Sequence, residues 1–310
     1  MYNTWVDVRE INSGLIQNIK LQMDMLRIEM PREELSMPPK VTIGNRERYS
    51  TATGVAFINE QLLVSAAFNS KRLYLIALTE NGHEILDSVK GRHHPDLLYY
   101  KDGMIATSDY PHMEPNGHLS IYDLVDNKIV FRKEITLPNT KAHGCTIVDA
   151  TTAIVTSNSD LNRGCLYIDI PTGKTVRHFN DFLYYPKDTY LTQDRLFVVT
   201  SESLPQVGQK TVIKGSKLYI FNSTTFSLLD ELDFHGQTDS LVVVGEDVFV
   251  VVQGDDTLVH AKCIDDKLSF VKRIGGFNFP HGIAAYGNKI AVTNYGDNTI
   301  RIFDLEELVN

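Results

Sequence analysis

The stretch FPHGIAAYGNKIAVTNYGDNTIRIFDL, Phe279 to Leu305, contains two apolar runs separated by a Gly-Asn-Lys turn and followed by a third, alternating run. Two apolar runs joined by a short polar turn are typical of a β-hairpin. The third run has the alternation of a strand with one buried face. This stretch predicts three consecutive antiparallel strands, with His281 at the start of the first strand.

Five earlier segments repeat the pattern at intervals of about 42 to 51 residues. Each copy has a small or acidic residue near its start, an apolar run, a polar turn and a second apolar run. The six copies begin at Thr53, Pro95, His143, Lys187, Thr238 and His281. A third run follows each hairpin, and a fourth, more polar run follows in the first five copies. Four antiparallel strands at this period predict an all-β, six-bladed propeller, since a β-sandwich would not repeat so regularly.

The sixth copy reaches the end of the sequence at Asn310 before a fourth strand can form. The segment PKVTIGN, Pro39 to Asn45, has strand character and can complete that blade, which removes an exposed sheet edge. We therefore expect residues 39–310 to form a propeller that is closed by an N-terminal strand.

Residues 1–38 stand outside the repeats and predict an N-terminal helical extension that ends at or before Pro31. Its apolar residues are three or four positions apart: Val8, Ile11, Leu15, Ile19, Met23, Leu26 and Met30. We expect this helix to pack on the propeller; the alternative is that it forms a homodimer or docks a protein partner.

The composition is that of an ordinary globular protein, with 43% apolar and 22% charged residues. A net charge of −9 argues against nucleic-acid binding. The sequence shows neither a basic leader nor 18 consecutive apolar residues, so we expect a soluble cytoplasmic protein without membrane contact. Cys145, Cys165 and Cys263 are too few and too scattered for a disulfide framework, which predicts buried free thiols.

The copy PHGIAAYGNKIAVTNYGDNTIRIFDL, residues 280–305, resembles the repeats of the NHL and YVTN β-propeller families. WD40 repeats fit less well, because the paired Gly-His and Trp-Asp signature dipeptides are absent. The resemblance implies the fold more strongly than a function, since such propellers include hydrolases, lyases, cyclases and interaction scaffolds.

There is also a distant resemblance to gluconolactonase-like hydrolases and strictosidine synthase. The gluconolactonase-like pattern implies a divalent metal held by a Glu of the first blade with an Asn and an Asp of later blades. The first copy, STATGVAF, offers no such Glu. The sequence leaves open whether a divalent metal binds in the central channel, and no ligand motif clearly encodes one.

In a four-stranded propeller blade, the start of the innermost strand and the turn after the second strand lie at the same end of the channel. The starts contribute Thr53, His94, Asp96, His143, Lys187, Asp188, Thr238, Asp239 and His281. The ends of the second strands contribute Asp109, Asn158, Glu202, Asp255 and Asn294. These positions predict a polar channel mouth that can perform general acid–base chemistry.

His143 and His281 belong to the third and sixth blades, so we expect them to face each other across the channel. Their separation is expected to be too large for one shared ion, unless water or substrate bridges it. The candidate catalytic residues are His143, His281, Lys187, Glu202 and Asp109. The candidate substrate-binding residues are His94, Asn158, Asp239, Asn294 and Tyr110.

Each of these features also has a structural interpretation. A His-Gly pair at a strand start can serve a turn, and Asp96, Asp188 and Asp239 recur as turn-capping residues do. Two insertions, residues 110–118 and 202–215, are either lids over the mouth or simple variation in loop length. A zinc site at His93–His94 would need further ligands.

Two functions remain. We favour a propeller that binds a small molecule and acts as an enzyme of the lyase, hydrolase or cyclase type. The alternative is a non-catalytic scaffold that binds a protein through the N-terminal helix or through an aromatic rim such as DFLYYP, residues 181–186.

Overall fold

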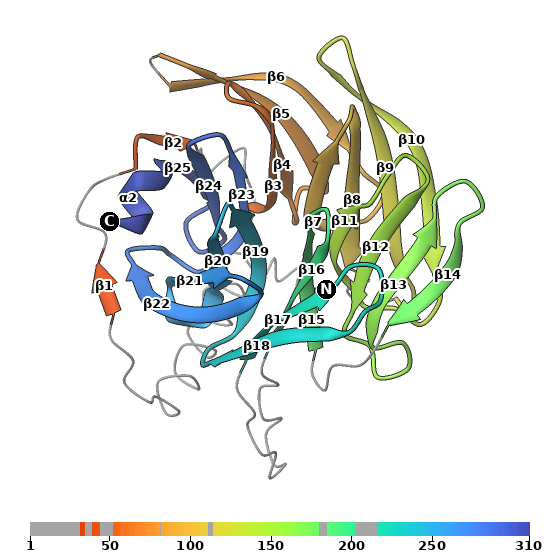
Figure 1. The fold of residues 1–310 in the computed structure, drawn as a ribbon. Helices are drawn as coiled ribbons and strands as arrows, with labels where there is room; N and C mark the ends of the chain where they lie inside the picture. The colour runs from red at the N-terminus through yellow and green to blue at the C-terminus, as the bar shows by residue number, and fades with distance from the viewer. Residues whose placement is uncertain are drawn as a thin grey trace, which may run out of the picture.

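The computed structural model describes residues 32–34, 39–43, 52–80, 82–110, 114–179, 185–201 and 216–310. These residues form six antiparallel sheets that follow one another around a ring, which confirms the six-bladed propeller (Figure 1). The expected helix over residues 1–30 lies outside the described residues. Within the predicted helical extension, Arg32–Glu34 form a strand, β1.

The first three blades each use four consecutive strands. Blade 1 contains β3 (Ala52–Asn59), β4 (Leu62–Ala67), β5 (Arg72–Thr79) and β6 (Gly82–Lys90). Blade 2 contains β7 (His94–Lys101), β8 (Met104–Tyr110), β9 (Gly117–Val125) and β10 (Lys128–Leu137). Blade 3 contains β11 (Ala142–Ile147), β12 (Thr152–Ser157), β13 (Gly164–Asp169) and β14 (Lys174–Phe179).

The last three blades include the two N-terminal strands. Blade 4 contains β15 (Tyr185–Leu191), β16 (Arg195–Ser201), β17 (Ser216–Asn222) and β18 (Leu228–Phe234). Blade 5 contains β19 (Thr238–Val244), β20 (Asp247–Val252), β21 (Thr257–Ile264) and β22 (Lys267–Gly275), with β1 (Arg32–Glu34) parallel to β22. Blade 6 contains β23 (Pro280–Tyr286), β24 (Lys289–Asn294), β25 (Thr299–Asp304) and β2 (Val41–Ile43).

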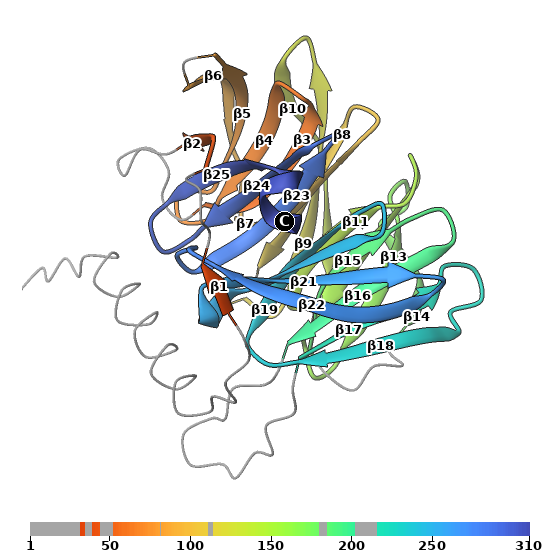
Figure 2. The ribbon, with the colours of Figure 1, turned by 60° about the vertical axis from the view of Figure 1, so that its left-hand side comes forward.

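Ring closure depends on β2, which pairs antiparallel with β25 and is the outer strand of blade 6. It lies inside the segment Pro39–Asn45 to which the sequence analysis assigns this place. The chain then ends in the short helix α2 (Leu305–Val309), whose capping box uses Asp304 and Glu307. Figure 2 shows β2 beside β25, with the C-terminus close to blade 6.

The core lies between the blades rather than inside any one of them. Six apolar clusters of described residues each join two neighbouring sheets, so every interface between blades has its own cluster. The inner strands are buried on both faces, whereas outer strands such as β14 and β18 are largely exposed. This gradient explains why the first two runs of each repeat are continuously apolar and the fourth is polar. Cys145, Cys165 and Cys263 are buried free thiols, as predicted.

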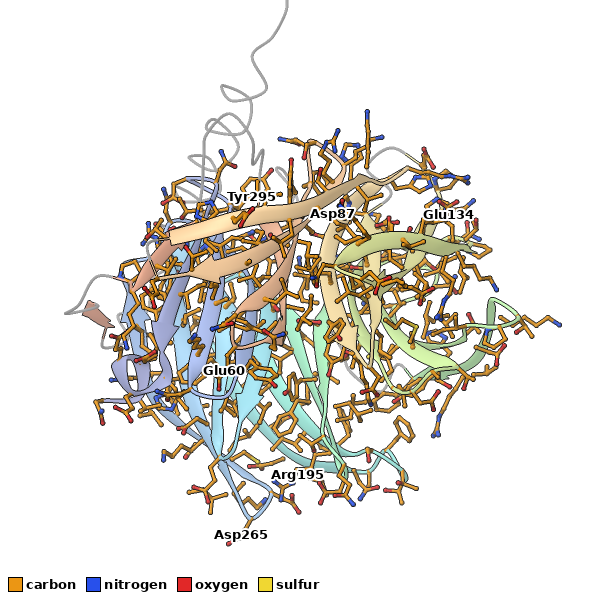
Figure 3. All side chains as sticks on the ribbon, turned by 90° about the horizontal axis from the view of Figure 1, so that it is seen from above. Glu60, Asp87, Glu134, Arg195, Asp265 and Tyr295 are labelled. Atoms are coloured by element: carbon orange, nitrogen blue, oxygen red, sulfur yellow. The ribbon has the colours of Figure 1, made fainter. Side chains whose placement is uncertain are left out.

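The two ends of the ring differ in the loops that they carry. We call the end at which the inner strands begin the upper face, and the end with the turns between first and second strands the lower face. Figure 3 shows Tyr295, which follows β24, toward the upper face, and Glu60 and Arg195 toward the lower face. The loops from second to third strands therefore lie on the same face as the predicted channel mouth.

Candidate functional site

Every inner strand has a β-bulge close to its first residue. The pairing with the second strand shifts between Ala52 and Val55 in blade 1, and at the equivalent place in the five other blades. A bulge inserts an extra residue and re-aims its side chain. The bulges place one set of equivalent residues around the channel: Thr53, Asp96, His143, Lys187, Asp239 and His281.

Five of these six side chains form a buried ionisable cluster that we call the channel cluster: Asp96, His143, Lys187, Asp239 and His281. His143 Nε2 lies 3.2 Å from Asp239 Oδ1 and 3.6 Å from Asp96 Oδ2. His281 Nε2 lies 3.2 Å from Asp96 Oδ1 and 3.9 Å from Asp239 Oδ2. The two imidazole rings are stacked, with centroids 5.8 Å apart. His143 and His281 therefore face each other across the channel, at closer range than the sequence suggested.

Lys187 is the fixed cation of the channel cluster. Its Nζ atom lies 3.1 Å from His143 Nε2 and 3.1 Å from Asp239 Oδ1. His143 Nδ1 lies 3.1 Å from the carbonyl oxygen of Lys187, which can only accept a hydrogen bond. Nδ1 therefore donates to this carbonyl, whereas Nε2 faces the Lys187 ammonium and the carboxylates of Asp239 and Asp96.

Burial and the neighbouring charges shift the pKa values of residues in the channel cluster. Burial acts to raise the pKa of Asp239, but the positive charge of Lys187 and the neighbouring imidazoles of His281 and His143 outweigh it and hold this pKa well below its usual range. Burial lowers the pKa of His281, and the proximity of His143 and Lys187 adds to this against the pull of Asp239 and Asp96. A neutral imidazole and an ionised carboxylate thus lie side by side at neutral pH.

Tyr295 completes the upper side of the channel cluster. Its ring stacks on His281 with centroids 6.0 Å apart. Burial, with the charges of Asp96 and Asp239, raises the pKa of Tyr295 to about 12. The phenol therefore stays protonated and remains a hydrogen-bond donor at neutral pH.

The structure brings together four of the ten predicted site residues: His143, His281, Lys187 and Asp239. The others lie elsewhere. His94 Nδ1 lies 3.0 Å from the carbonyl oxygen of Phe68 in blade 1. Asn294 Oδ1 accepts a hydrogen bond of 3.0 Å from the amide of Asn278. Asp109 accepts hydrogen bonds from Thr107 and Ser120 inside blade 2, and burial raises its pKa to about 7.

Of the remaining three predicted residues, two are described, and neither forms a hydrogen bond or ion pair with the described residues of the channel cluster. Asn158 is half-buried, and its Oδ1 atom has no hydrogen-bond partner among the described residues. Tyr110 is half-buried at the end of β8. Glu202 lies outside the described residues, as does the insertion 202–215. The insertion 110–118 is described from Glu114 onward.

Asp96 is a site residue that sequence reasoning missed, because it was grouped with Asp188 and Asp239 as a turn cap. The carboxylates of Asp96 and Asp239 instead contact the two histidines. The bulge registers show that Asp96 and Asp239 are equivalent to His143, whereas Asp188 is one residue further along. The second and fifth repeats were therefore aligned one position too early.

A cavity of about 450 Å³ occupies the channel below the cluster. Its walls are inner-strand residues of all six blades, from the bulges to the lower turns, and include Tyr99, Tyr190 and Phe57. Asp188 borders this cavity and is held by Ser240 Oγ at 2.7 Å and by the amide of Thr189 at 2.8 Å. Burial raises the pKa of Asp188 to about 7. The channel therefore combines apolar walls with a few polar groups, as small-molecule sites do.

A metal ion is the other occupant that the channel cluster can accept. Ligand atoms of Asp96, His143 and His281 lie within 4.8 Å of one another. The expectation that the two histidines are too far apart to share an ion is therefore wrong. An ion bound there would compete with Lys187, whose ammonium already contacts His143 Nε2.

The comparisons with known proteins identify the fold. No protein-family model matches the chain, and no curated protein is significantly similar in sequence. The chain is similar in structure to the WD40 β-propeller domain of Doa1, with a TM-score of 0.60, 10% identity and coverage of 89% of this chain and 97% of that one.

Two further solved structures are similar over most of their length. A chain of the mitotic checkpoint complex has a TM-score of 0.61 at 10% identity and covers 90% of this chain and 97% of its own. Kuenenia stuttgartiensis hydrazine synthase has a TM-score of 0.56 at 14% identity, with coverage of 82% and 83%. In the part of the chain that the structure describes, no helix is long and apolar enough to cross a membrane. At these identities the similarity establishes a β-propeller and nothing finer.

Proposed function

We propose that this protein binds a small molecule in the central channel and acts on it as an enzyme of the lyase, hydrolase or cyclase type. The observation that carries the proposal is the channel cluster. Five ionisable side chains from five blades converge through equivalent bulges, and four of them are at least nine-tenths buried. The repeat motif of residues 280–305 further supports an NHL- or YVTN-like propeller.

A structural role is a poor explanation of the cluster. Burying charged groups costs free energy that pairing only partly offsets, and apolar replacements of such groups are often as stable or more stable. The equivalent position in blade 1 is Thr53, whose hydroxyl donates to the carbonyl oxygen of Pro95 at 3.1 Å. An uncharged side chain therefore suffices for the architecture at this position. Concentrated buried charges with displaced pKa values are typical of active sites.

The chemistry available is proton transfer. In its neutral form, with the proton on Nδ1, His143 presents the lone pair of Nε2 and can act as a general base once the substrate displaces the contact with Lys187. His281 Nε2 lies 3.2 Å from Asp96 Oδ1, which orients the ring with a proton on Nε2. Lys187 Nζ and the Tyr295 hydroxyl are the donors that can stabilise negative charge on the substrate.

A metabolite-turnover experiment tests this proposal. Wild-type protein and the variants His143→Gln and His281→Gln are incubated with a metabolite extract, and the extracts are compared by mass spectrometry. We expect at least one compound to be consumed by the wild type, and its turnover to fall roughly 10²- to 10⁴-fold in each variant. The matched control is His178→Gln, which changes an exposed histidine of blade 3 and should retain turnover.

A non-catalytic scaffold is the second candidate, and one surface favours it. Val125, Val130 and Phe131 lie on the outer β9–β10 hairpin and are 42–51% exposed. Exposed apolar side chains on one outer hairpin suit a protein partner with an apolar surface. A scaffold leaves the metabolite extract unchanged by wild type and variants alike, and that result would contradict the enzyme.

A further inference from the structure

A second group of ionisable side chains lies in blade 2, outside the channel cluster. His93 lies in the linker between β6 and β7, Glu114 precedes β9, His118 is on β9 and Glu134 is on β10. We call these four residues the blade 2 cluster. They meet at the upper face, where Figure 3 shows Glu134 on the side of the molecule away from Tyr295.

The distances in the blade 2 cluster are short enough for one shared ligand. His93 Nε2 lies 3.4 Å from Glu134 Oε2, and His118 Nδ1 lies 4.0 Å from Glu134 Oε1. His118 Nε2 lies 3.8 Å from Glu114 Oε2. Ligand atoms of His93, Glu114 and His118 all lie within 4.8 Å of one another. Three of the side chains thus offer ligand atoms within reach of one ion, and Glu134 lies beside both histidines.

His118 shows that the cluster lacks a component. Its side chain is 9% exposed, and neither ring nitrogen has a hydrogen-bond partner among the described residues. Glu134 Oε2 is likewise a buried oxygen without a hydrogen bond. Buried polar atoms are almost always satisfied, so three such atoms in one cluster indicate a missing partner.

The charge of the blade 2 cluster selects a cation. Glu114 and Glu134 bring two carboxylates, and the fixed positive charge paired with Glu134 among the described residues is Arg92, at 3.9 Å and 73% exposed. Neutral imidazole nitrogens with carboxylate oxygens are the ligand set that zinc and its neighbours in the first transition row prefer. Glu114 is 62% exposed and leaves a path from solvent.

We propose that His93, Glu114, His118 and Glu134 bind a divalent first-row transition metal of the zinc type. Four-coordinate zinc holds its ligands at about 2.0–2.2 Å, so the side chains must close in. The stacked rings of His93 and His118, whose centroids are 3.7 Å apart, must also turn to point their nitrogens at the ion. Four protein ligands make this a closed structural site. It ties the linker between blades 1 and 2 and the β8–β9 loop to the outer strands of blade 2.

Zinc titration of the chelator-treated full chain tests the site. The free metal is followed with a competing chromophoric chelator, and the wild type is compared with the double variant His93→Gln/Glu114→Gln. We expect the double variant to bind one equivalent fewer and Glu114→Gln alone to bind at least tenfold more weakly. Both positions are partly exposed, at 21% and 62%, so the variants should fold, and circular dichroism checks this.

A control variant separates this site from the channel cluster, which can also bind a metal. His143→Gln should retain the equivalent that the double variant loses. Cobalt(II) bound in place of zinc should give the visible absorption of a four-coordinate ion in the wild type and in His143→Gln. Equal zinc binding by the wild type and the double variant would overturn the proposal, and so would an equivalent lost only in His143→Gln.

Discussion

Lys187 and Asp188 are neighbours in the sequence, but they belong to different environments. Lys187 is on the bulge and points into the channel cluster, whereas Asp188 borders the cavity below it. The lysine charge and the neighbouring imidazoles hold the pKa of Asp239 far below its usual range, while burial raises the pKa of Asp188 to about 7. Because their pKa values are shifted in opposite directions, the two carboxylates suit different roles. Asp239 suits that of a fixed negative charge, and Asp188 suits that of a proton donor.

The raised pKa of Asp188 predicts a specific pH dependence of stability. The folded state keeps the proton up to about pH 7, whereas the unfolded state loses it near the ordinary value of 3.8. Unfolding therefore releases a proton between these values, and stability falls as pH rises through this window. The pKa of Asp188 rises from 3.8 to about 7 on folding, which corresponds to a contribution of about 4 kcal/mol to the free energy of unfolding.

Asp188→Asn should remove this contribution and flatten the decline between pH 4.5 and pH 8. Urea denaturation at several pH values measures it, with Asp160→Asn as an exposed control that should keep the wild-type slope. Asp109 titrates in the same range and adds its own slope in all three proteins. Superimposable curves for wild type and Asp188→Asn would contradict the assignment.

At the scale of the strand, the β-bulge near the start of each inner strand places the side chains of the channel cluster. A hydroxyl on the second strand, opposite the bulge, connects neighbouring blades: Thr156 Oγ1 accepts from the amide of Gly144 at 2.7 Å and donates to the carbonyl oxygen of Lys187 at 2.7 Å. Ser108 and Thr293 make the corresponding bonds in blades 2 and 6. The bulge residues of the channel cluster are therefore fixed by contacts to the backbone of adjacent inner strands.

Gly144 follows His143 on the bulge and allows blade 4 to approach blade 3. A Cβ atom there would lie 2.5 Å from the carbonyl oxygen of Lys187 and 2.6 Å from Asp188 Oδ1. We predict that Gly144→Ala lowers the free energy of unfolding by about 1–3 kcal/mol and displaces Lys187, so that turnover also falls. Gly91→Ala is the control, because its Cβ meets first the movable Tyr122 hydroxyl at 3.2 Å. Equal unfolding midpoints for the two variants would argue against this contact.

The bulges also limit how much of the candidate site could be predicted from the sequence. Apolar runs and polar turns identify strands, and their sixfold repetition identified the ring. A bulge adds one residue without changing the apolar pattern around it, so the register of Asp96 and Asp239 with His143 could not be read from the repeats. Recurrence of an acidic residue then suggested turn caps. The blade 2 cluster could not be predicted from sequence spacing either. Only the loop after β6 and the β9–β10 pairing bring His93 near His118 and Glu134.

At the scale of the molecule, the ring is held by its six interfaces and by one closing strand. Ile43 of β2 is fully buried and packs in the cluster between blades 6 and 1. Lys40, just before this strand, forms an ion pair with Asp304. The last blade is thus stabilised by residues from the opposite end of the chain.

Ile43→Ala should weaken the whole ring rather than one blade. Loss of a fully buried isoleucine costs about 2–5 kcal/mol, and we expect the unfolding midpoint to fall with a single transition in chemical denaturation. Amide exchange of residues 300–302 should accelerate, because these residues pair with β2. Val41→Ala, on the same strand but half-buried, is the control and should have a smaller effect. A separate early transition confined to blade 6 would show instead that closure is not cooperative.

The place of β2 also orders events during synthesis on the ribosome. Residues 41–43 are translated before blades 1 to 6, whereas their partner β25 belongs to the last of these blades to be translated. Until then the growing chain carries a strand with an unsatisfied edge, and blade 1 has no neighbour on the side that blade 6 will cover. The nascent protein can assemble five blades in succession but can only become a closed ring after release of residues 299–304 from the exit tunnel. A chaperone acting on this protein would therefore be needed most until β25 becomes available to pair with β2.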